Sequence, residues 1–148
     1  MTDWRPHPAS DLPDGLILFD GVCIMCSAWV DFIIPRDPGG RYRFVPVQSE
    51  FGGMLAARFG IDPEAPQSNV VLRDGRAWFK ADAVIVVGRD LPGWRWTAAL
   101  RLLPRPVRDA AYDLVARNRY RLFGRRDHCM IPSPAIRHRF ITGPGELA

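Results

Sequence analysis

Apolar residues in the first half of the chain alternate between runs typical of buried strands and spacings typical of helices. Residues 16–19, LILF, form a short apolar run that ends at an Asp-Gly pair, which predicts a buried strand. From residue 24 the apolar side chains recur at helical intervals until Pro35, which predicts a helix. Residues 41–47 then predict a second strand, and residues 48–59 a second helix closed by a glycine.

A hairpin and a further helix follow this strand–helix–strand–helix order. Asp74 and Gly75 stand between two strand-like runs in NVVLRDGRAWFK, and Asp-Gly is the strongest short hairpin signal. Residues 81–91 predict the next helix, with Asp82 able to cap its start. A βαβ half implies a parallel strand pair joined by a right-handed crossover. The whole order, βαβ and then ββα, predicts an α/β fold of the thioredoxin-like three-layer type.

The chain after residue 93 is expected to form a C-terminal helical extension of that core. Residues 94–103 predict one helix, which Pro104 breaks. Residues 106–123 predict another, whose apolar stripe indicates a face that packs against other elements. The stripe consists of Val107, Ala111, Leu114, Val115 and Leu122.

We expect one domain over residues 1–148. Its parts would be a thioredoxin-like core at about residues 16–92, the helical extension at 93–124 and a tail at 125–148. The tail shows little periodicity and is predicted to be loop. A chain of 148 residues with 47% apolar content is long enough to bury a substantial core.

Composition also bears on the compartment. No apolar run approaches the ~20 residues that span a bilayer, so we expect no membrane span. The first residues, MTDWRPHPASDLPDG, are polar and rich in proline, and they lack the basic start and apolar centre of a signal peptide. A cytoplasmic location is therefore expected.

The net charge of +4 rests almost wholly on arginine, because Lys80 is the only lysine. The densest run, RNRYRLFGRR at residues 117–126, is expected to be a solvated helix face near a C-terminal end, where the helix dipole favours cations. No nucleic-acid-binding motif accompanies the charge, so we expect no nucleic-acid partner. A non-catalytic interaction domain that uses this helix as its contact surface remains an alternative.

The candidate chemistry lies in the CxxC formed by Cys23 and Cys26. Three cysteines are too few for a disulfide scaffold, and in a reducing compartment such a pair is more often catalytic or metal-binding. A cysteine at a helix N-terminus faces unsatisfied N–H groups and the positive end of the dipole, and both favour the thiolate. We predict that Cys23 is the nucleophile and that Cys26, one turn further on, is the resolving thiol. The pair itself would then be the redox group, with no added cofactor.

Other residues could extend this site. Asp20 either forms the turn at the helix start or accepts a proton from the resolving thiol, and its charge opposes a thiolate at Cys23. Cys129 is a possible accessory thiol or a small buried apolar residue. The alternative to redox chemistry is a zinc-binding module that uses Cys23, Cys26, Cys129 and His128.

The motif DxxCxxC, formed here by Asp20, Cys23 and Cys26, resembles that of the DCC-type thiol-disulfide oxidoreductases, a thioredoxin-like family. The resemblance extends through RFVPVQS, VVLRDGR, ADAV and the block LLPRPVRDAAYDLVARNRYRLFGRRDHC, and so covers most of residues 16–132. It implies a thioredoxin-like fold and thiol–disulfide exchange with a protein or small-molecule disulfide or thiol.

One departure from thioredoxins concerns how a substrate is held. Thioredoxins place a cis-proline just before the third strand, where it holds an extended substrate. In this sequence Ser68 and Asn69 lead into that strand, and Pro66 lies one position too early. The resemblance therefore implies the redox pair without implying the substrate-binding device.

Overall fold

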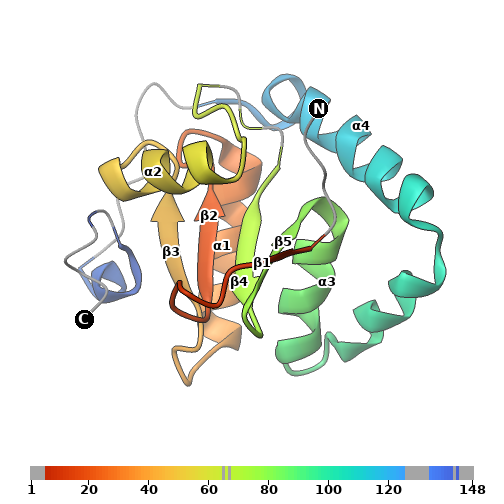
Figure 1. Ribbon diagram of the computed structural model, residues 1–148, viewed down its shortest axis with the longest axis horizontal. Helices are drawn as coiled ribbons and strands as arrows, with labels where there is room; N and C mark the ends of the chain where they lie inside the picture. The colour runs from red at the N-terminus through yellow and green to blue at the C-terminus, as the bar shows by residue number, and fades with distance from the viewer. Residues whose placement is uncertain (1–5, 65, 67, 126–133, 142, 144–148) are drawn as a thin grey trace.

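A mixed five-stranded sheet forms the centre of the computed structural model, which describes residues 6–64, 66, 68–125, 134–141 and 143 (Figure 1). The strands lie in the order β1-β5-β4-β2-β3, and β2 and β3 are parallel while the other pairs are antiparallel. Their bounds are β1 His7–Pro8, β2 Leu16–Phe19, β3 Arg43–Pro46, β4 Val70–Arg73 and β5 Arg76–Phe79.

Four α-helices and two 3₁₀ helices complete the described part of the chain. They are α1 Ile24–Arg36, α2 Glu50–Arg58, α3 Lys80–Asp90, η1 Arg95–Leu102, α4 Arg105–Phe123 and η2 Arg137–Arg139. The order from β2 to α3 is βαβ followed by ββα, with the parallel pair that the sequence predicted. The predicted thioredoxin-like α/β fold is therefore confirmed.

The alternation of side chains along β2 divides the core between the two faces of the sheet. Leu16 and Leu18 pack in a cluster that includes residues of α2, whereas Ile17 and Phe19 pack with residues of α1 and α3. Successive strand residues point to opposite faces, so this run of four apolar residues is buried on both sides. The strand that leads to the CxxC is thus held rigidly.

Local chemistry explains where several elements begin. Asp74 and Gly75 both have positive φ, 57° and 73°, as the tight turn between β4 and β5 requires. Helix α2 begins after Ser49, not at residue 48, because the Ser49 hydroxyl accepts the Gly52 N–H at 3.0 Å and so acts as its N-cap. Helix α1 continues one residue past Pro35.

The predicted cap at Asp82 is wrong. Helix α3 begins after Phe79 without a side-chain cap, and the Lys80 N–H is donated to the Ser68 hydroxyl at 2.8 Å. The Asp82 carboxylate instead accepts hydrogen bonds from Arg105 and Arg108 of α4. It therefore ties α3 to α4.

The C-terminal half differs from the sequence prediction in more than one respect. Residues 94–103 give the 3₁₀ helix η1 instead of an α-helix, whereas α4 follows as predicted. The apolar stripe of α4 is largely exposed, because the helix turns Ala116 and Arg119 toward the protein instead. In the tail, Phe140 and Ile141 enter the core, and the Ile141 N–H is donated to the Phe44 carbonyl at 2.8 Å.

Figure 1 shows how α4 relates to the sheet: it arches past α3 and reaches the end of the sheet where β2 and β3 terminate. It contacts both α1 and α3. This arrangement brings residues from the last third of the chain to the beginning of α1.

Candidate active site

The CxxC pair lies just after β2, where α1 begins. Cys23 is the N-cap of α1, and its sulfur accepts the backbone N–H of Cys26 at 3.4 Å. Cys23 is fully buried, whereas Cys26 is partly exposed, and both thiols are free. The structure therefore has the dithiol at the helix N-terminus, as the sequence predicted.

The two thiols differ strongly in acidity. The pKa of Cys23 is lowered to about 6, mainly by its side-chain hydrogen bond with Cys26 and further by the Cys26 N–H and the charge of Arg119. Burial and the charge of Asp20 oppose this change. The pKa of Cys26 is raised, because its thiol shares that hydrogen bond, loses part of its hydration to the surrounding protein and faces the negative sulfur of Cys23. Cys23 is thus the more acidic thiol of the pair.

Asp20 is buried near the pair, and both of its carboxylate oxygens accept hydrogen bonds. Its Oδ1 accepts the Val22 N–H at 3.2 Å and the Gln48 Nε2–H at 2.7 Å. Its Oδ2 accepts the Tyr120 hydroxyl and, at 3.4 Å, the Arg119 guanidinium. These contacts fix the turn between β2 and α1, and neither thiol is among the hydrogen-bond partners of Asp20 in the described part of the chain.

Arg119 is a site residue that the sequence did not predict. It lies in the run expected to be a solvated helix face, yet it is only 8% exposed. Its guanidinium donates to the carbonyls of Ala116 at 2.7 Å and Pro66 at 2.9 Å in addition to the Asp20 contact. Its neighbour Tyr120 has its pKa raised to about 12 by burial and by the hydrogen bond with Asp20. A usable signal was its spacing from Tyr112 and Ala116, which puts all three on one face of α4.

The end of α4 also covers the first cysteine. The Ile24 N–H is donated to the Gly124 carbonyl at 3.4 Å, and Cys23 and Arg125 form an isolated antiparallel bridge. Gly124 has φ +94°, and a Cβ there would lie 3.1 Å from the Ile24 side chain. The close approach therefore suits glycine at this position.

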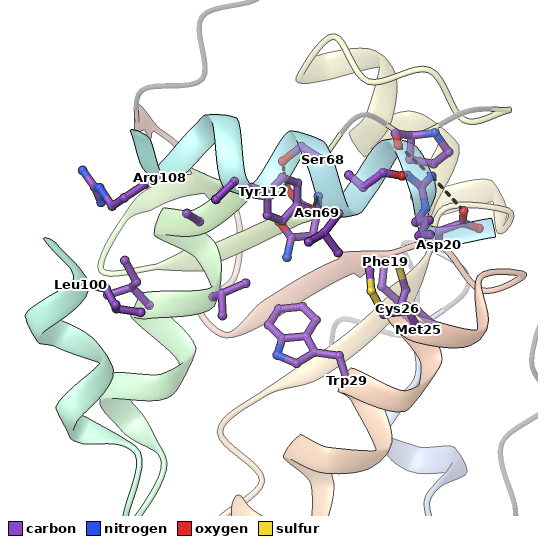
Figure 2. Close-up of a pocket in the computed structure, with 18 of the residues that line it drawn as sticks. Phe19, Asp20, Met25, Cys26, Trp29, Ser68, Asn69, Leu100, Arg108 and Tyr112 are labelled. Carbon is purple, nitrogen blue, oxygen red and sulfur yellow. Dashed lines mark hydrogen bonds and ion pairs between the residues drawn. The ribbon is translucent and has the colours of Figure 1, made fainter. Parts of the chain in front are cut away.

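A cavity of about 480 Å³ lies beside the second cysteine (Figure 2). Cys26 and Trp29 of α1 line one side of it, and Tyr112 and Val115 of α4 line another. Its walls are mostly carbon, with Ser68 and Asn69 among the few polar contributions.

The remaining sequence candidates lie outside the described residues. Cys129 and His128 belong to residues 126–133, so the accessory-thiol role and the zinc alternative stay hypotheses. Within the described ranges, no three His, Cys, Asp or Glu side chains gather as a metal site would require.

A thioredoxin-like fold with a CxxC pair at the start of its first long helix defines a class of dithiol proteins. The comparison with known families agrees: the profile of the DCC1-like thiol-disulfide oxidoreductases matches residues 17–125. The chain belongs to this family. At the family level, this supports a thiol-disulfide oxidoreductase role.

Two relatives have similar sequences. The uncharacterized protein YuxK of Bacillus subtilis (strain 168) is 42% identical over 134 residues, which are 90% of this chain and 98% of that protein. The chloroplastic DCC family protein At1g52590 of Arabidopsis thaliana is 39% identical over 132 residues, 86% of this chain and 77% of that protein. No solved structure gives a significant match.

The comparisons leave the expected compartment open. One relative is named as chloroplastic, so the cytoplasmic location stays a prediction. No helix in the described part of the chain is long and apolar enough to cross a bilayer.

Proposed function

We propose that the protein exchanges disulfides through the Cys23–Cys26 dithiol, with Cys23 as the nucleophile and Cys26 as the resolving thiol. The observation that carries this proposal is the position of the Cys23 sulfur as the N-cap of α1. There the sulfur accepts a backbone N–H, and the Cys23 thiol has a pKa of about 6. At neutral pH most molecules would therefore have Cys23 as the thiolate.

The dithiol and the substrate disulfide supply all the atoms and electrons of the reaction, and solvent exchanges the protons. The Cys23 thiolate attacks one sulfur of a substrate disulfide, forms a mixed disulfide and releases the first substrate thiolate, which takes up a proton. Cys26 then loses its proton and attacks the Cys23 sulfur, which releases the second substrate thiol. Two electrons pass from the dithiol to the substrate, and Cys23 and Cys26 end as a disulfide.

Arg119 supports this chemistry by its charge, and Asp20 supports it by its position. Arg119 favours the thiolate of Cys23, and Asp20 holds Arg119 while it fixes the turn before the cysteine. We assign Asp20 a positioning role, because its oxygens already accept hydrogen bonds from four residues.

Burial decides how a substrate reaches Cys23. The Gly124–Arg125 segment lies against Cys23, which is fully buried and does not line the cavity. Of the two cysteines, Cys26 is the one that lines it. A substrate sulfur would therefore approach the pair from the cavity, with its remaining atoms next to Cys26.

The test uses single cysteine variants in a Cys129→Ser background, so that only the pair can react. Pre-reduced protein is mixed with bis(hydroxyethyl) disulfide, and the products are followed by intact mass and by thiol release. We expect Cys26→Ser to accumulate a mixed disulfide at Cys23 and Cys23→Ser to lose exchange.

The double variant Cys23→Ser/Cys26→Ser is the control and should release no thiol. Undiminished turnover in Cys23→Ser would overturn the proposal that disulfide exchange requires the Cys23–Cys26 dithiol. A mixed disulfide trapped on Cys26 in Cys23→Ser would overturn the order of the two cysteines.

A further inference from the structure

We propose that the cavity beside Cys26 is the substrate-binding site and that it takes a small disulfide with apolar, amide-bearing arms in preference to an extended protein segment. This inference rests on the proposed dithiol chemistry and adds the class of substrate. Three separate observations carry it: the shape and lining of the cavity, the unpartnered polar atoms around it, and the occupation of the backbone groups that an extended chain would need.

The cavity has the size and lining of a small-molecule site. Its volume of about 480 Å³ lies within the range of roughly 300–1,000 Å³ usual for ligand pockets. Figure 2 shows Trp29 on one side and Leu100 and Tyr112 on others, with Cys26 at the end near Asp20. A ligand whose sulfur meets the dithiol would thus have its arm among apolar side chains.

The mouth of the cavity is apolar as well. Val84, Leu100, Leu103 and Val115 line it and are all exposed, although large apolar side chains are usually covered in a folded protein. Val84 comes from α3, Leu100 from η1 and Val115 from α4, and Leu103 directly follows η1. Charged and strongly hydrated disulfides would lose hydration at this apolar mouth and find no ionic partner among these four side chains.

Polar atoms without partners indicate what else the ligand carries. In the described part of the chain, the buried side-chain atoms that lack a hydrogen-bond partner are Asn69 Oδ1, Arg108 Nε and Arg119 Nε, and all three residues line the cavity. Arg119 is more than nine-tenths buried. Buried polar groups normally have partners, and a small shift of these side chains toward the cavity would let a ligand with one donor and one acceptor supply them, which a pure hydrocarbon cannot do. An amide supplies both.

The backbone around the site argues against an extended protein substrate. The N–H of Asn69, which precedes β4, is donated to the Tyr112 hydroxyl at 3.2 Å. The carbonyl of Pro66 accepts from Arg119 at 2.9 Å. Side chains of α4 thus occupy the groups on which a substrate strand would pair, and the space that they leave is the cavity.

The first experiment measures reduction of two disulfides by the wild type and by two neighbouring variants. The apolar amide probe is N,N′-dibutanoylcystamine, and the hydrophilic reference is bis(hydroxyethyl) disulfide. Ala111→Phe places a ring in the cavity, whereas Ala110→Phe changes an exposed residue on the same helix that does not line it. Neither alanine belongs to the dithiol machinery.

We expect Ala111→Phe to lower kcat/KM for the amide probe about tenfold, equivalent to ~1.4 kcal/mol, and to lower it by a clearly smaller factor for the reference, whose arms are shorter and more hydrated. Ala110→Phe should leave both rates unchanged. Equal effects of Ala111→Phe on both disulfides would overturn the cavity as a selective site. Faster reduction of a protein disulfide than of the amide probe, unaffected by Ala111→Phe, would overturn the substrate class.

A second measurement does not depend on redox chemistry. N,N′-Dibutanoyl-hexamethylenediamine has the shape of the probe with two methylene groups in place of the disulfide. We expect calorimetry to detect its binding to the wild type and to the Cys23→Ser/Cys26→Ser variant, with binding lost in Ala111→Phe and retained in Ala110→Phe. Failure to bind the wild type would overturn the inference even where the reference disulfide is reduced.

The two measurements separate the two proposals. Binding of this analogue without reduction of either disulfide would contradict the dithiol function and leave the cavity as a ligand site. If both disulfides were reduced at similar rates and the diamide analogue did not bind, the dithiol function would be supported. The proposal that the cavity is the substrate-binding site would then be contradicted.

Discussion

Two buried aspartate–arginine pairs lie at opposite ends of α1, and they differ in how completely their groups are satisfied. At the C-terminal end, Asp37 pairs with Arg139 at 2.7 Å, and at the N-terminal end Asp20 pairs with Arg119 at 3.4 Å. In each pair the arginine comes from about a hundred residues further along the chain and is buried.

The pair at the C-terminal end of α1 is closed, in the sense that every guanidinium nitrogen has a hydrogen-bond acceptor, whereas the pair at the N-terminal end is open. All three side-chain nitrogens of Arg139 donate: Nε to the Tyr42 carbonyl, and the other two to the Asp37 carbonyl and carboxylate. At the other end, Arg119 Nε has no hydrogen-bond partner in the described part of the chain. The Arg119 side chain lines the cavity, and its charge lowers the pKa of Cys23. The closed pair therefore fixes the chain, whereas the open pair retains a charge that can act on its surroundings.

The largest expected effect is on stability at the closed pair. Arg139→Met leaves the buried Asp37 carboxylate without its cation, and we expect it to lower the free energy of unfolding by about 4 kcal/mol. The pKa of Cys23 should stay near 6. Urea denaturation and a thiolate absorbance titration in the Cys129→Ser background measure the two quantities. Arg137→Met, at an exposed neighbour, is the control and should change stability by less than about 0.5 kcal/mol.

At the open pair, a single change should affect both quantities. Arg119→Met should lower the free energy of unfolding by about 3 kcal/mol and raise the pKa of Cys23 toward its ordinary value, because a buried cation is removed. Adding Asp20→Asn should recover part of the stability. Arg117→Met, exposed on the same helix, should change neither. A Cys23 pKa that does not move would contradict the assigned role of Arg119.

A smaller loss is expected from the tyrosine beside that pair. Tyr120→Phe removes the hydroxyl that donates to Asp20, and we expect a loss of about 1.5 kcal/mol, typical of a hydrogen bond to a charged group. Chemical denaturation measures it. A loss below ~0.5 kcal/mol would mean that Asp20 is held by its other donors alone.

The smallest expected effect is a change in the titration of Cys23 when Asp20 is neutralised. Its pKa of about 6 lies below its ordinary value of 9.0, so the thiolate stabilises the fold fully above about pH 9 and loses this effect as the pH falls through 6. Because the Asp20 charge raises that pKa, Asp20→Asn should lower it, by less than about 1. Asp37→Asn, at the distant pair, should not change it. If the Cys23 thiol had the same pKa in Asp20→Asn and Asp37→Asn, the two aspartates would not differ in their effect on the cysteine.

Much of the fold follows from local sequence. The run 16–19 is apolar at every position, and Asp74 and Gly75 suit a turn with positive φ, so β2 and the β4–β5 hairpin were predictable. The face that α4 buries was not, because its apolar stripe faces largely outward while Ala116 and Arg119 face inward. The burial of Phe140 depends on a partner strand nearly a hundred residues earlier, which no local pattern specifies.

The residues of the candidate site likewise include some that the sequence predicts and some that it does not. Cys23 and Cys26 were predictable, because their spacing and their place after a strand are visible in the chain. Arg119 was harder to recognise. Its spacing from Tyr112 and Ala116 was a signal, but an arginine amid other arginines on a helix is usually solvated, and its partner Asp20 lies 99 residues away. Tyr112 and Asn69 likewise become site residues only when α4 crosses the end of the sheet.

Since the Cys23 sulfur is itself the N-cap of α1, the helix begins on a group whose charge changes during the reaction. In the dithiol form, a negative sulfur holds the amide proton of Cys26 and complements the helix dipole. Formation of the disulfide neutralises that sulfur, and we expect the first turn to be held less tightly. The exchange of the Cys26 amide with deuterated solvent should therefore be slower in the reduced protein than in the oxidised one, so that the backbone itself records the redox state.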